Sequence, residues 1–87
     1  MFEFHWTDDS EAHIARHGVA PEEVEQAAGR PFYTTPGRGG TTLLLGQTHS
    51  GRYLLVVLSG SGDGRWQVVT ARTMTEAERR VFKKKAK

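Results

Sequence analysis

The chain has 87 residues, 37% of them hydrophobic, a net charge of +2 and no cysteine. This length predicts one domain, 1–87, with a single modest core. The absence of cysteine excludes disulfides and thiolate metal sites. No apolar run approaches the roughly 20 residues that a membrane span needs, and no basic segment leads into an apolar stretch at the start, as it does in a signal peptide. We therefore expect a cytoplasmic protein with no membrane partner.

The start of the chain is predicted to hold a short strand followed by a short helix. Apolar and polar residues alternate over Phe2–Trp6, and this period of two indicates a half-buried strand. Asp8 and Glu11 then have the spacing of a capping box, which predicts the start of a helix. This helix is expected to end at His17, because Gly18 readily takes the left-handed conformation that closes helices.

A second helix and an irregular segment are expected next. Pro21 suits the first position of a helix, and the glutamates that follow it favour the positive end of the helix dipole. Gly29 and Pro31 stop this helix, and residues 32–34 are expected to form a short extended piece. The glycine-rich residues 36–40 predict a flexible loop.

Three strands are predicted in the second half of the chain, at Thr41–Leu45, Tyr53–Leu58 and Trp66–Arg72, joined by segments rich in turn residues. The middle strand is apolar at every position, whereas a strand covered on one face alternates, so we expect it to be central and covered on both faces. One layer of helices is available within the chain. The second cover is then either a partner chain or the curl of the sheet.

A last helix completes the predicted fold. Thr75 and Glu78 form another capping box and start a helix that runs to about Lys84. Three of its apolar residues are expected to face inward, namely Ala77, Val81 and Phe82. Together the elements predict an α+β fold, in which a small antiparallel sheet of three or four strands packs against two N-terminal helices and a C-terminal helix.

The charges are divided unevenly along the chain. Residues 1–30 carry seven acidic and two basic side chains, whereas residues 31–87 carry ten basic and three acidic ones. A basic half indicates an anionic partner, with nucleic acid as the first candidate. All four lysines lie within residues 83–87, where the alternative is a solvated tail. The arginines are spread through the chain, several of them next to predicted strands and turns.

Two histidines lie one helical turn apart in the first predicted helix. His13 and His17 share a face, and an H-x-x-x-H pair can hold zinc, although Ile14 stands where zinc proteases have a glutamate. Since the pair flanks the buried face that carries Ile14, the two imidazoles are alternatively half-buried packing residues. The third interpretation is proton transfer or contact with phosphate, because imidazole gains and loses protons near neutral pH.

Three arginines lie at predicted strand ends, where antiparallel neighbours bring distant residues together. Arg52 begins the central strand, Arg65 precedes the next strand, and Arg72 ends it. Converging guanidinium groups stabilise the charge that builds up during phosphoryl transfer. The alternative is that each arginine is solvated or pairs with a carboxylate. The candidate partners are Glu22, Glu23 and Glu78.

Several segments match, in order and spacing, the pattern of one known family. The residues that carry the match are Phe4–Trp6, His13–Val19, Pro21–Glu25, Gly51–Val57, Val68–Arg72, Thr75, Glu78 and Arg79. In these segments the chain resembles BrnT-type toxins. The pattern of that family begins with a tryptophan, a short helix with Lys/Arg-His-Gly-Val, and an acidic helix. A G-R-x-L-x-V-V strand and an I-I-S-A-R segment follow. Gln67, Ser59 and His13 depart from the family, which has arginine at the first two places and asparagine at the third.

The resemblance implies a RelE-like fold and the toxin half of a type II toxin–antitoxin pair. Such toxins are small ribonucleases that inhibit translation and need neither a metal nor another cofactor. The resemblance therefore implies RNA as the substrate and a cognate antitoxin protein as the partner. A homodimer and a toxin–antitoxin hetero-oligomer are both open as assemblies.

The leading hypothesis is RNA cleavage, in which a ribose 2′-hydroxyl attacks the adjacent phosphorus. His13 or His17 would move a proton, while Arg52 and Arg72 would hold the charged phosphoryl oxygens. The residues expected to position the RNA backbone are Arg38, Arg65, Arg79, Arg80, Lys83 and Lys84. One rival is a non-catalytic module that binds nucleic acid or the antitoxin, and another is a metal-dependent hydrolase that uses both histidines.

Overall fold

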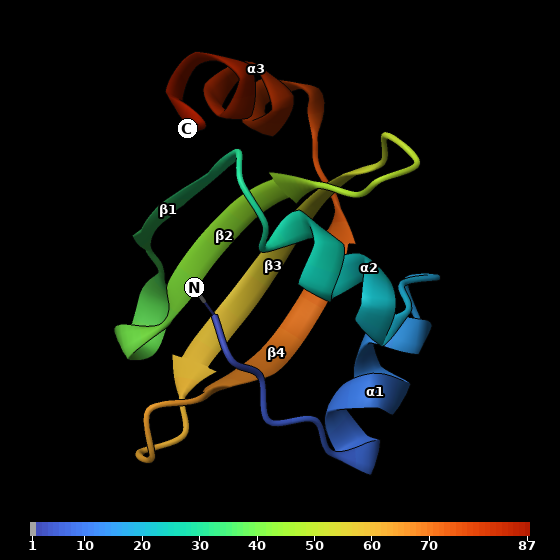
Figure 1. Cartoon of the computed structure of the whole chain (residues 1–87), viewed down its shortest axis with the longest axis vertical. Coiled ribbons are helices and arrows are strands. Elements are labelled where there is room, and N and C mark those ends of the chain that lie inside the picture. The colour runs from blue at the N-terminus through green and yellow to red at the C-terminus, as the bar shows by residue number, and fades with distance from the viewer. Residues whose placement is uncertain (1) are drawn as a thin grey trace.

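The computed structural model describes residues 2–87 and has a four-stranded antiparallel sheet with helices packed on both faces (Figure 1). The helices are α1 (Asp8–Ala15), α2 (Pro21–Ala27) and α3 (Glu76–Lys85), with a 3₁₀ turn, η1, at Arg38–Gly40. The strands are β1 (Phe32–Pro36), β2 (Thr42–Gln47), β3 (Tyr53–Gly60) and β4 (Trp66–Thr73). The sheet order β1–β2–β3–β4 follows the chain, so every strand pairs with its sequence neighbour. The predicted α+β fold is confirmed.

The apolar run of β3 is divided between the two faces of the sheet. Leu54, Val56 and Leu58 lie in the cluster that α1 and α2 cover, whereas Leu55 lies in a second cluster with Phe82 of α3. Successive side chains of a strand point to opposite faces, so a strand buried on both faces is apolar throughout. On the second face Leu55 is thus covered by Phe82 of α3, a helix of the same chain, while Val57 on that face stays half-buried.

The first helix has a different cap from the one predicted. Thr7, rather than Asp8, is the N-cap: its Oγ1 accepts the N–H of Ser10 at 3.1 Å, and the Ser10 hydroxyl oxygen accepts the N–H of Thr7 at 3.0 Å. Asp8 instead lies in the first turn, where a carboxylate favours the positive end of the helix dipole. The helix ends at Ala15, two residues early, and Gly18 takes the expected left-handed conformation with φ of 69°.

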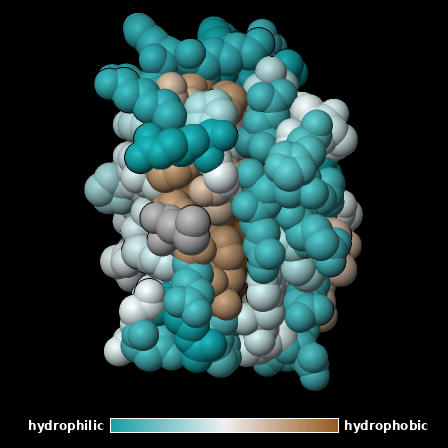
Figure 2. Space-filling view, viewed as in Figure 1, coloured by the Kyte–Doolittle hydropathy of each residue, from teal (hydrophilic) through white to brown (hydrophobic). Residues whose placement is uncertain are grey.

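The two ends of the chain lie along opposite edges of the sheet. Phe4 forms an isolated parallel bridge with Trp66, so Phe2–Trp6 is not the strand that its alternation predicts. At the other edge, Phe32 and Lys87 exchange two backbone hydrogen bonds of 3.1 Å. Half-buried aromatic side chains of the N-terminal segment pack against the α1–α2 cluster, and Figure 2 shows a hydrophobic stripe on the face seen in Figure 1.

The C-terminal helix packs on the sheet through one aromatic side chain. Phe82 is 4% exposed and lies edge-on to Tyr53, with ring centroids 5.7 Å apart. Ala77 and Val81, which were expected to face inward, are exposed instead. Most of the surface of α3 is therefore left to its arginines and lysines. Among residues 2–87, no helix is long and apolar enough to cross a membrane.

Candidate nucleic-acid interface

Cationic side chains from separate parts of the chain meet where β3 begins and β4 ends. The guanidinium of Arg52 donates to Oγ1 of Thr73 at 3.3 Å, and that of Arg72 donates to the carbonyl of Thr73 at 3.2 Å. Arg52 also donates to the carbonyl of His17, in the α1–α2 turn, at 3.2 Å. Together with a tyrosine of β3 and two cations of α3, these residues form the strand-end cluster: His17, Arg52, Tyr53, Arg72, Thr73, Arg79 and Lys83.

The β3–β4 hairpin explains why these residues meet. In this antiparallel pair Leu54 lies opposite Thr73, so the first residues of β3 lie beside the last residues of β4 and the start of α3. The N–H of Met74 donates to the carbonyl of Tyr53 at 3.0 Å and holds the approach to α3 against β3. The α1–α2 turn reaches the same end of the sheet because α2 packs on β2 and β3.

Arg52 is a structural link between β3 and the N-terminal helices. Besides the bonds to His17 and Thr73, its guanidinium donates to the carbonyl of Gly18 at 2.7 Å and to the carboxylate of Glu23 at 3.2 Å. A guanidinium has five N–H groups, and protein acceptors engage both terminal nitrogens here. Arg52 therefore holds the α1–α2 turn in place and has little donor capacity left for a ligand. Of the carboxylates considered as partners, Glu23 is the one that pairs with it.

Arg72 forms a bidentate ion pair with Glu78 of α3. Its two terminal nitrogens donate to the two carboxylate oxygens at 2.8 Å each. These hydrogen bonds raise the pKa of Arg72 and lower that of Glu78, and the N–H of Thr75, which donates to Glu78 at 2.8 Å, adds to the lowering. The Arg72 side chain is still 40% exposed. Arg72 therefore remains accessible to a ligand from solution, although its charge is paired with that of Glu78.

Two cationic side chains of α3 lie over the ring of Tyr53. The guanidinium carbon of Arg79 lies 4.4 Å from the ring centroid, and the ammonium of Lys83 lies 5.6 Å from it. Both distances are within the range of a cation–π interaction. The aromatic ring thus holds two exposed positive charges of α3 beside the start of β3.

The two histidines have different surroundings. Both are exposed, so the interpretation of His13 and His17 as half-buried packing residues is wrong. His17 belongs to the strand-end cluster through its carbonyl. His13 instead lines a shallow groove of about 370 Å³ between α1 and β4, whose other lining residues are Thr7, Asp9, Ser10, Gln67, Val68 and Val69. Over the described residues 2–87, no three His, Asp or Glu side chains gather as metal ligands do.

The remaining predicted binding residues fall into two groups. Arg80 and Lys84 lie exposed on α3, and Arg80 approaches Glu76 no closer than 3.9 Å. Arg65 lies in the β3–β4 turn, at the far end of the hairpin, where the carboxylate of Asp63 accepts its guanidinium N–H at 2.7 Å. Their hydrogen bonds raise the pKa of Arg65 and hold that of Asp63 well below its usual range.

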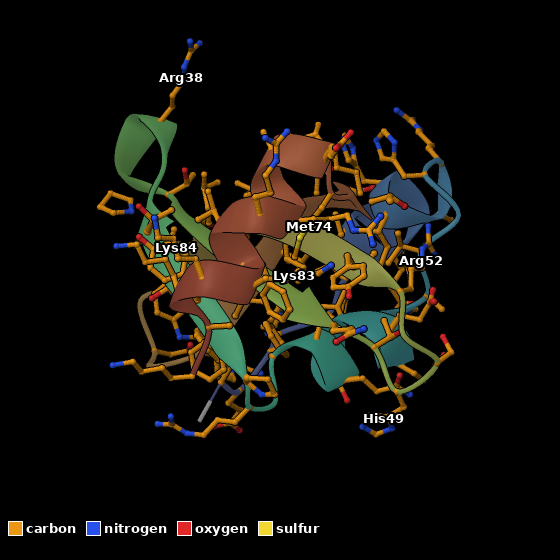
Figure 3. The ribbon with its side chains drawn as sticks, turned by 90° about the horizontal axis from the view of Figure 1, so that it is seen from above. Arg38, His49, Arg52, Met74, Lys83 and Lys84 are labelled. Atoms are coloured by element: carbon orange, nitrogen blue, oxygen red, sulfur yellow. The ribbon has the colours of Figure 1, made fainter. Side chains whose placement is uncertain are left out.

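Arg38 lies apart from the cluster. It belongs to η1, which connects the end of β1 to the start of β2, and Thr42 of β2 pairs with Leu58 near the far end of β3. Figure 3 shows its side chain extending away from the ribbon, on the opposite side from Arg52. The structure therefore separates Arg38 and Arg65 from the strand-end cluster.

Two members of the cluster were not identified from the sequence. Thr73 has no motif of its own, and its role follows only from the position at which β4 ends beside Arg52. Tyr53 is one apolar residue in an apolar strand, and only the docking of α3 shows that its ring underlies two cations.

Comparison with known proteins gives no assignment: no family model, no curated protein and no solved structure matches the chain.

Proposed function

We propose that the chain is a metal-independent endoribonuclease, the toxin of a type II toxin–antitoxin pair, with a RelE-like fold as the resemblance to BrnT-type toxins implies. The observation that supports this most is that Arg52 and Arg72 both donate to Thr73, while Arg52 also holds the backbone of His17, whose side chain is exposed. An exposed imidazole and a part-exposed guanidinium at one sheet end are the groups that cleavage of a phosphodiester needs.

The proposed reaction uses the exposed side chain of His17 and the part-exposed guanidinium of Arg72. His17 would take the proton of a ribose 2′-hydroxyl as the 2′-oxygen bonds to the adjacent phosphorus, and the bond from phosphorus to the 5′-oxygen would break as that oxygen takes a proton from water. The part-exposed guanidinium of Arg72 would hold the phosphoryl oxygens, on which negative charge increases. Arg52 would position the α1–α2 turn that carries His17. His13 lies in a separate groove, and proton transfer is assigned to His17 alone.

The RNA strand would continue along the cationic surface of α3. Arg79 and Lys83 over Tyr53, and the exposed Arg80 and Lys84, would contact successive phosphates without reading sequence. The partner that restrains the activity would be a cognate antitoxin protein in a hetero-oligomer, and the setting would be the cytoplasm.

A second candidate function is a non-catalytic module that binds RNA or the antitoxin. It is favoured by one observation, namely that carboxylates already pair with both arginines, Glu23 with Arg52 and Glu78 with Arg72. This alternative predicts binding that weakens with salt, because released counterions drive it, and no cleavage.

RNA cleavage by the purified chain in excess chelator separates the two candidates. We expect the wild type to cut RNA and the variants His17→Gln and Arg72→Gln to lose activity by a factor of about 100. Matched controls are His49→Gln, an exposed histidine of the β2–β3 turn, and Arg38→Gln (Figure 3). Intact RNA with folded wild type would favour the binding module, and equal losses in controls and test variants would contradict the proposed site.

The biological role has a test in cells. Induction of the wild-type chain is expected to arrest growth, and co-expression of the neighbouring reading frame is expected to relieve the arrest. Arrest that Arg72→Gln leaves unchanged would contradict a role for the strand-end cluster in toxicity.

A further inference from the structure

The carboxylate of Glu78 occupies both terminal nitrogens of Arg72. A guanidinium recognises carboxylate and phosphate in the same way, by two parallel N–H···O bonds from its planar fork. In the structure both oxygens of Glu78 accept such bonds, at 2.8 Å each. The bidentate face of Arg72 is thus occupied by a group of the same chain.

Glu78 has a second role at the start of α3. It is the third residue of the helix, and its Oε1 accepts the N–H of Thr75 at 2.8 Å, while Oγ1 of Thr75 accepts the N–H of Glu78 at 3.2 Å. This reciprocal pair is a capping box, which stabilises the first turn of a helix. A movement of Glu78 away from Arg72 would therefore also change the capping of the helix that carries Arg79 and Lys83.

We infer that Glu78 is an intramolecular competitor for phosphate: its carboxylate occupies the bidentate site of Arg72 until a phosphodiester displaces it. The inference rests on the proposed function, since RNA is the ligand concerned. Displacement is feasible because the pair is not sealed from water; the side chains of Arg72 and Glu78 are 40% and 25% exposed. The free chain would accordingly bind RNA more weakly than the same chain without the carboxylate of Glu78.

The other acidic residue of α3 provides a contrast. Glu76 lies two residues before Glu78, is 88% exposed, and approaches Arg80 only to 3.9 Å. An exposed pair of this kind contributes little. Glu76→Gln and Glu78→Gln change the net charge of the same helix equally, so any difference between them reports the contact with Arg72.

The test compares these two variants in binding to a short single-stranded RNA. Glutamine also suits the third position of a capping box, so Glu78→Gln weakens the ion pair and keeps the helix cap. We expect Glu78→Gln to bind RNA about tenfold more tightly than the wild type and Glu76→Gln to differ by less than about twofold. Addition of Arg72→Gln to Glu78→Gln should remove the gain. Equal affinities for the two single variants would overturn the inference.

A second measurement does not depend on RNA. Inorganic phosphate is titrated into each protein while the Nε–H resonance of Arg72 is followed by NMR. We expect phosphate to shift this resonance in Glu78→Gln at concentrations that leave it unchanged in the wild type and in Glu76→Gln. If no variant binds or cuts RNA, the proposed function fails, and the phosphate titration alone decides the inference: identical shifts in all three proteins, or none, would contradict it.

Discussion

Gly46 of β2 lies so close to Ala27 of α2 that a Cβ at position 46 would overlap the backbone carbonyl of Ala27. Both residues are buried. The close approach lets α2 lie directly on the sheet, and α2 carries Glu23, which pairs with Arg52 of the strand-end cluster. The absence of a side chain at one position of β2 thus helps to position residues of the candidate site.

Gly46→Ala is therefore expected to destabilise the fold. The added methyl group meets backbone, which cannot rotate away, so we expect the free energy of unfolding to fall by about 3 kcal/mol. The measurement is chemical denaturation followed by circular dichroism. Gly60→Ala is the control, because a Cβ there meets nothing within 4 Å. Similar stability for the two variants would contradict the close packing of α2 on β2.

Arg52→Lys tests whether Arg52 is a structural link. Lysine keeps the charge but cannot reproduce the fork that reaches Gly18, His17, Glu23 and Thr73. We expect the free energy of unfolding to fall by about 1–3 kcal/mol, with Arg38→Lys unchanged within about 0.5 kcal/mol. An Arg52→Lys variant that is as stable as the wild type but binds RNA more weakly would instead make Arg52 a direct ligand contact.

The Arg72–Glu78 pair predicts a pH dependence of stability. Because the pKa of Glu78 is lowered from its ordinary value of 4.5 in the folded state, its contribution is fully present above that value. The contribution is lost as the pH falls through the lowered pKa. We expect Glu78→Gln to be less stable than the wild type by about 1 kcal/mol at pH 7 and the difference to shrink below pH 4.5. A difference that stays constant down to pH 3 would contradict this ion pair.

The salt dependence of RNA binding locates the contact surface. Each phosphate contact with a single strand contributes about 0.7 to the slope of log K against log salt concentration. The double variant Arg79→Gln/Lys83→Gln should reduce the magnitude of the slope by about 1.4. Arg38→Gln/Arg65→Gln removes the same charge from residues outside the strand-end cluster and should leave the slope unchanged. The reverse result would place RNA away from the cluster.

Much of the fold can be predicted because it follows from local signals. The unbroken apolar run of β3 predicts a strand buried on both faces, and Thr75 with Glu78 predicts the start of α3. Positions set by tertiary packing were harder to predict. Val81 has the apolar character of a buried residue, yet α3 is anchored through Phe82 and leaves Val81 42% exposed.

The candidate site was predictable in its residue types and only partly in its geometry. The position of Arg72 at a strand end predicted convergence, and Glu78 was already a candidate partner. The separate surroundings of His13 and His17 could not be predicted, because a spacing of four residues places both on one face of a helix. The actual end of α1 at Ala15 puts His17 in a turn that Arg52 holds, whereas His13 stays on the helix beside β4.

The chemistry of the cut is the most direct test of the claim that the strand-end cluster cleaves RNA. An RNA oligonucleotide and its fully 2′-O-methylated copy are incubated with the wild type and with Arg72→Gln in excess chelator, and the products are analysed by mass spectrometry. We predict that the wild type cuts only the unmodified RNA, leaving 2′,3′-cyclic phosphate and 5′-hydroxyl ends, and that Arg72→Gln leaves it intact. Intact RNA after incubation with the folded wild type, or equal cutting of both oligonucleotides, would contradict the claim.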